Sequence, residues 1–70
     1  MRPEEIISQA LKNVGDDRYK LSLMVAKRVE MLTNGSPVLT ENADRTMKFA
    51  DIALLEIAEG KIGVDGNPKE

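Results

Sequence analysis

The side chains that could carry out chemistry in this chain are carboxylates, lysines, arginines and a single tyrosine, because its 70 residues include no histidine and no cysteine. A Ser-His or Cys-His nucleophile is therefore impossible, and no side chain has an unperturbed pKa near 7. The commonest zinc ligands are missing for the same reason. The carboxylates and lysines stand in no recognisable catalytic spacing. We therefore expect no catalytic residue, no metal site and no cofactor.

One acidic fragment, Asp65-Gly66-Asn67, is typical of part of a calcium-binding loop. Such loops alternate oxygen ligands along the chain and close with a glutamate at a fixed spacing. This fragment has neither feature, so we predict no calcium site there.

The charge pattern argues against direct binding to nucleic acid or to a membrane. The net charge is −2, and no cluster of lysine and arginine is large enough to follow a phosphate backbone. The first residues, MRPEE, differ from the apolar run of a secretion signal, and no segment has membrane-spanning length. We expect a cytoplasmic protein.

The elements that must position these side chains are helices. We predict an all-α fold, a small compact bundle of about three helices with an irregular loop at residues 34–46 and a flexible C-terminal tail. Proline and two acids open a first helix from Pro3 to Asn13. The longest helix lies between Asp17 and Gly35, which are cap residues, and we expect the rest to pack on it. A third helix is predicted from Asp44 to Glu59.

The core of this chain is expected to give only marginal stability, since a chain of 70 residues buries only about 60% of the surface that its unfolded form exposes. The second and third helices carry apolar residues beyond one face, which indicates cover by a partner. Arg28 alone is typical of a solvated surface arginine. Glu56 and Glu59, near a helix C-terminus, fit either a contact outside the helix or a solvated acidic face. Residues at helical spacing on the inner faces are predicted to form the core: Ile7, Leu11, Val25, Val29, Leu32, Ala53 and Ile57.

Two blocks of residues together resemble the family of omega subunits of bacterial RNA polymerase. The first block is Asp17-Arg18-Tyr19-x-Leu21, Ala26-x-Arg28 and Leu32-x-x-Gly35. The second is Ile52-Ala53-x-x-Glu56-Ile57-x-x-Gly60-Lys61-Ile62. The resemblance covers residues 4–62, so we assign residues 1–62 to an omega-type helical domain and residues 63–70 to a flexible tail.

This resemblance implies an accessory subunit that has no catalytic residues of its own. Members of the family wrap the C-terminal part of the beta-prime subunit, latch it towards that subunit's N-terminal region, and assist its assembly with beta and the alpha dimer. The magnesium-binding aspartates belong to the partner, so nucleotidyl transfer is a property of the complex. Arg28 is then expected to meet a partner carboxylate or backbone carbonyl, and Glu56 a partner group or a local bond. The predicted partner contacts are Arg18, Tyr19, Leu21, Leu23, Met24, Arg28, Ile52, Leu55 and Glu56.

Two other classes of protein also fit three short helices. A helical DNA-binding transcription regulator would use the second or third helix for recognition, although the acidic third helix would repel phosphate. A self-associating helical adaptor would cover its surplus apolar surface with a second copy.

The N-terminus generates a first testable prediction. In some omega subunits the extreme N-terminus helps to bind guanosine tetraphosphate at the beta-prime interface. Here only Arg2 could contact the phosphates, and Glu4 and Glu5 follow it closely, so their negative charge opposes binding. We expect weak or absent binding of this alarmone to the assembled polymerase at this site. Tight binding that Arg2→Ala abolishes, measured by calorimetry, would contradict this.

Overall fold

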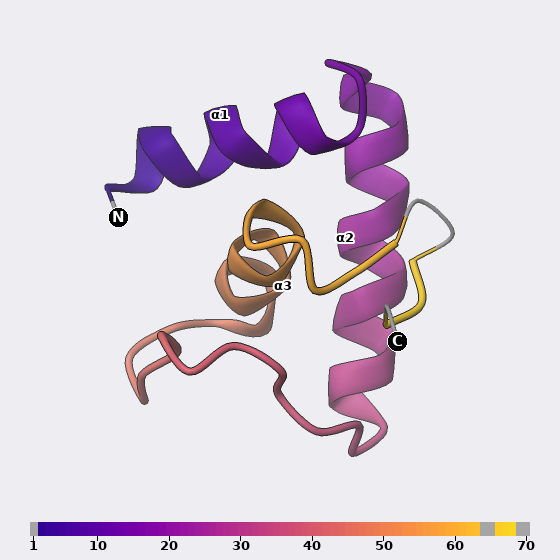
Figure 1. Cartoon of the computed structure of the whole chain (residues 1–70). Helices are drawn as coiled ribbons and strands as arrows, with labels where there is room; N and C mark the ends of the chain where they lie inside the picture. The colour runs from indigo at the N-terminus through magenta and orange to yellow at the C-terminus, as the bar shows by residue number, and fades with distance from the viewer. Residues whose placement is uncertain (1, 64–65, 69–70) are drawn as a thin grey trace.

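The computed structural model describes residues 2–63 and 66–68, and within them the chain forms α1 (Pro3–Asn13), α2 (Arg18–Thr33) and α3 (Phe49–Ala58) (Figure 1). The predicted all-α class is confirmed. The first two helices keep their predicted ranges, whereas α3 begins at Phe49 rather than at Asp44. The reason is local, because Asp44 Oδ1 accepts hydrogen bonds from the backbone N–H of Thr46 at 2.8 Å and from its hydroxyl. Such a turn competes with helix formation.

All three helices end in the same backbone motif. After α3, the N–H of Gly60 donates to Ile57 O at 3.1 Å and the N–H of Lys61 donates to Glu56 O at 2.9 Å. This pair of bonds satisfies carbonyl groups that the helix leaves unpaired, and it requires a left-handed residue, which Gly60 supplies with φ of 76°. Equivalent bonds follow α1 and α2. The chain therefore turns sharply after each helix, which brings the helices back onto one another.

The central helix of the fold is α3. It packs against both α1 and α2, whereas those two contact each other little beyond the turn that joins them (Figure 1). Six of its ten residues are buried: Ile52, Ala53, Leu55, Glu56, Ile57 and Ala58. The prediction that the rest of the chain packs on the second helix is therefore wrong. A helix that is apolar on most of its circumference has to lie inside, and α3 is the one that meets this condition.

A side chain of α1 forms hydrogen bonds with carbonyl groups at the C-terminus of α3. The Asn13 amide donates to Ile57 O at 2.8 Å and to Ala58 O at 3.1 Å. Carbonyl groups in the last turn of a helix have no partner within the helix itself. Asn13 therefore fixes the C-terminus of α1 against the C-terminus of α3.

The segment after α3 returns towards α2. Ile62 is buried and forms an isolated antiparallel bridge with Pro68, and Gly63 N–H donates to Asn67 O at 2.8 Å. A Cβ atom on Gly66 would lie only 3.1 Å from the Lys27 Cδ, so this turn passes close over α2. Part of the predicted tail is thus bonded to the domain. Residues 64, 65, 69 and 70 lie outside the described residues, and flexibility there stays a prediction.

None of the three helices in the described part of the chain has both the length and the apolar character that crossing a membrane requires.

Candidate functional site

A fully buried ion pair joins α2 to α3. Arg28 Nε donates to Glu56 Oε1 at 2.6 Å, and Arg28 Nη2 donates to Glu56 Oε2 at 3.1 Å. Both residues are 0% exposed. Two parallel N–H···O bonds between a guanidinium and a carboxylate are the strongest form of such a pair, and they fix its geometry as well.

The same pair holds the connection between α2 and α3. Arg28 Nη2 also donates to Pro37 O at 2.7 Å, and the Leu39 N–H donates to Glu56 Oε2 at 2.6 Å. Across the described residues, every buried side-chain nitrogen or oxygen has a hydrogen-bond partner. The ion pair therefore ties two helices and the segment around Pro37 and Leu39 into one unit.

The structure shows that the groups bonded by Arg28 and Glu56 lie within this chain. Arg28 was expected to meet a partner carboxylate or carbonyl, and it meets both kinds of group within its own chain. Glu56 makes local bonds, which was one of its two expected alternatives. Neither side chain is accessible to a second protein.

Four apolar residues that were also predicted to contact a partner lie inside the chain. Leu21 and Met24 are 8% and 3% exposed, and Ile52 and Leu55 are 6% and 4% exposed. On α2 the buried residues are Leu21, Met24, Arg28 and Leu32, which lie on one face at helical spacing. An arginine occupies the middle of an otherwise apolar stripe, and that position was the available signal that it is buried. Sequence spacing alone does not identify it, because arginine is rarely buried without a partner, and its partner, Glu56, lies 28 positions away in the sequence.

The predicted core residues are also distributed unevenly. Leu32, Ala53 and Ile57 are buried, and Leu11, Val25 and Val29 are half-buried. Ile7, in contrast, is 42% exposed, because it lies at the edge of the contact between α1 and α3 and not inside it.

The outer face of α2 carries the predicted contacts that remain accessible. Tyr19 is 75% exposed and Leu23 is 54% exposed, and the neighbouring Arg18 is exposed as well. Tyr19 and Leu23 are four residues apart and therefore share one face, opposite Arg28. We call Tyr19 and Leu23 the outer α2 face; Arg18, one residue before Tyr19, lies about a quarter of a turn away from it on α2. The contact of these three residues with a partner stays a prediction.

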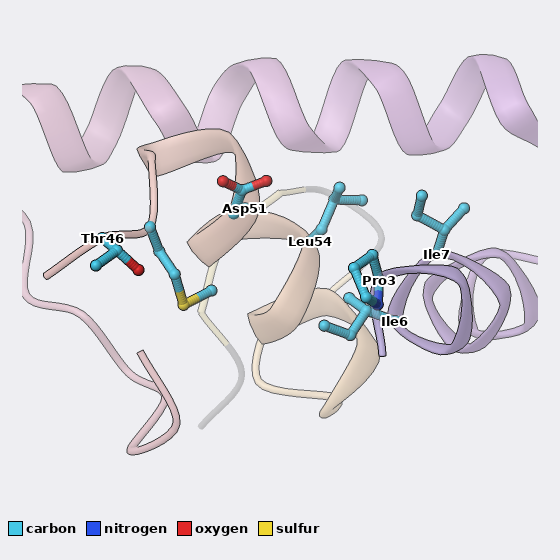
Figure 2. Close-up of a pocket in the computed structure, with 7 residues that line it drawn as sticks. Pro3, Ile6, Ile7, Thr46, Asp51 and Leu54 are labelled. Carbon is cyan, nitrogen blue, oxygen red and sulfur yellow. The ribbon is translucent and has the colours of Figure 1, made fainter. Parts of the chain in front are cut away.

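A second accessible feature is a hollow between α1 and α3 with a volume of about 370 Å³. Figure 2 shows Ile6 and Ile7 on the α1 side and Asp51 and Leu54 on α3. Ile7 and Leu54 also line a neighbouring hollow of about 380 Å³ that reaches Val25 of α2. The two hollows adjoin each other at these side chains and together make an apolar surface beside α1 and α3. We call it the α1–α3 groove; its lining is Pro3, Ile6, Ile7, Leu21, Ser22, Val25, Ala26, Thr46, Met47, Asp51 and Leu54.

No group of three or more acidic side chains in the described residues is arranged to hold a metal ion. Arg2, the predicted alarmone contact, is exposed immediately before the acidic first turn of α1. What these residues offer is therefore accessible apolar surface on a scaffold fixed by a buried ion pair. These features define a small helical protein, with three helices in the described part of the chain and apolar side chains exposed on α1, α2 and α3.

Comparison with known proteins gives the family. A family model described as RNA polymerase Rpb6 matches residues 10–64, which include both members of the ion pair. Proteins named DNA-directed RNA polymerase subunit omega from Campylobacter curvus and Campylobacter concisus are 63% and 65% identical over 65 residues, covering 93% of this chain and 92% of each relative. The omega subunit of Helicobacter pylori is 48% identical over 64 residues, covering 91% of this chain and 86% of that protein. No solved structure matches the chain significantly. The chain belongs to the RNA polymerase Rpb6 family and, within it, to the omega subunits of DNA-directed RNA polymerase.

The ion pair generates a stability prediction. Arg28→Ala leaves the Glu56 carboxylate buried without its counter-charge, and removing one partner of a buried pair costs about 3–5 kcal/mol. We expect urea unfolding followed by circular dichroism to show a loss of this size. Lys20→Ala removes an exposed cation from the same helix and should change stability by less than about 0.5 kcal/mol. Equal effects of the two variants would contradict the structural role of Arg28.

Proposed function

We propose that this chain is the accessory subunit of a bacterial RNA polymerase, which binds the beta-prime subunit, latches its N- and C-terminal regions together, and promotes its joining with beta and the alpha dimer. It contributes no catalytic residue to the nucleotidyltransferase and works in the cytoplasm with the polymerase. The observation that carries this proposal is the similarity to omega subunits over more than nine-tenths of the chain.

The distribution of apolar side chains supports a protein partner. Tyr19 and Leu23 project from the outer α2 face with more than half of their surface exposed. Large apolar side chains in this position gain about 1.5–3 kcal/mol each when a partner buries them. Tyrosine and arginine are also the residue types that most often dominate the binding energy of interfaces. Arg18 and Tyr19 would therefore act with Leu23 as the anchor of the contact.

The buried ion pair has an indirect part in this proposal. It fixes the rotation of α2 about its axis, because Arg28 must point towards Glu56 of α3. Leu23 and Tyr19 then have to face outwards. Arg28 would support binding by orienting the outer α2 face, and its loss would lower affinity through the fold.

The outer α2 face gives a binding prediction. Leu23→Asp places a charge on the proposed contact at a position that the isolated chain leaves exposed, so the variant should fold and yet lose affinity. We expect at least a tenfold weaker association with polymerase lacking its omega subunit, measured by interferometry. Ser8→Asp is the matched control, since it adds the same charge at an exposed position of α1.

Two results would contradict the proposal. One is failure of the wild-type chain to co-purify with the beta-prime subunit when alpha, beta and beta-prime are co-expressed with it. The other is an equal loss of affinity for Leu23→Asp and Ser8→Asp, which would mean that α2 makes no specific contact.

A further inference from the structure

The α1–α3 groove is a second accessible surface, separate from the outer α2 face. Along α2 it involves Leu21, Ser22, Val25 and Ala26, whereas Tyr19 and Leu23 do not line it. Its other wall is formed by Pro3, Ile6 and Ile7, and the family model matches the chain only from residue 10 onwards. This wall therefore lies outside the segment that matches the family model.

The groove is lined by one charged residue, an aspartate, and the hollow beside it by a second aspartate. Asp51 lines the groove on the α3 side, as Leu54 does, whereas Ile7 lies on the α1 side (Figure 2). Asp44 lines an adjoining hollow of about 320 Å³ that shares Ile6 and Met47 with the groove. The residues that line these three hollows include no lysine and no arginine. An occupant of this surface has to match an apolar floor and a negatively charged rim.

Both carboxylates are held in place by hydrogen bonds. Asp44 accepts from the hydroxyl and from the backbone N–H of Thr46, and these bonds hold its pKa below the ordinary value. Asp51 Oδ2 accepts from the Lys48 N–H at 3.2 Å at the start of α3. These bonds hold each carboxylate against the backbone of its own turn at the rim of the groove.

This chemistry disfavours two other occupants. A nucleic acid would bring phosphates against Asp44 and Asp51, and like charges repel. A second copy of this chain would bring a net charge of −2 to an acidic rim. A segment of another protein that carries both basic and apolar side chains would meet neither of these repulsions.

We propose that the α1–α3 groove binds an amphipathic segment of a polymerase subunit, with apolar side chains against Ile7 and Leu54 and a lysine or arginine against Asp44 and Asp51. This rests on the proposed function and adds to it a second contact with defined chemistry. Met47 suits the floor of such a groove, because its flexible side chain can adapt to an occupant.

Site-specific crosslinking tests the groove directly, since the chain contains no cysteine and any introduced one is unique. Ile7→Cys, Leu23→Cys and Ser8→Cys are each labelled with a benzophenone maleimide, assembled with alpha, beta and beta-prime, and irradiated. We expect position 7 to give an adduct with a polymerase segment that carries apolar residues beside a lysine or arginine, and position 8 to give at least fivefold less.

The outcomes separate this inference from the proposed function. An adduct at position 23 without one at position 7 overturns the groove contact alone. No adduct at either position, with no co-purification of polymerase, overturns both. An adduct at position 7 between two copies of the chain, or with an acidic segment, overturns the proposed occupant.

The charge of the rim has its own test. The double variant Asp44→Asn/Asp51→Asn keeps the hydrogen-bond acceptors and removes two charges, so it should weaken polymerase binding about fivefold at low salt, with a smaller difference at 0.5 M salt. Asp16→Asn/Glu41→Gln removes two charges from exposed positions elsewhere and is the control. Equal affinities for the two double variants would show that the rim does not meet a cation.

Discussion

The fold depends on an arginine and a glutamate placed where apolar side chains are normally found. Burying each of these charges costs several kcal/mol, and their mutual attraction offsets this cost only if every remaining polar atom is also paired. Here Pro37 O and the Leu39 N–H complete the pairing. For a 70-residue chain the total stability is of the order of 4–10 kcal/mol, so breaking this one pair removes a large part of it.

The pairing also determines where the long connection between α2 and α3 can run. Two bonds from this segment reach the ion pair, so the segment has to pass directly over it. With Arg28 turned inwards, Tyr19 and Leu23 face outwards on the opposite side of α2. The ion pair thus separates the residues of α2 that hold the fold from those available to a partner. This separation explains how a small chain can expose large apolar side chains without needing them for its own core.

Sequence patterns predicted the helices well and the roles of their side chains less well. Local signals such as Pro3, the Asp17 cap and Gly60 are sufficient to place helix ends, because they act within a few residues. The start of α3 was missed because the turn of Asp44 and Thr46 uses the same cap chemistry as a helix start. The inward direction of Arg28 depends on Glu56, a tertiary contact that no local pattern reports. Ile7, whose spacing matches a core residue, is exposed because α3 leaves the edge of α1 uncovered.

The central claim is that Arg28 and Glu56 act as one energetic unit, and a double-mutant cycle measures this directly. Arg28→Met, Glu56→Leu and the double variant are unfolded in urea beside the wild type. If the pair acts as one unit, each single variant loses about 3–5 kcal/mol and the double variant is more stable than either, with a coupling energy above about 2 kcal/mol. If the two losses simply add, the ion pair is not what holds this fold together.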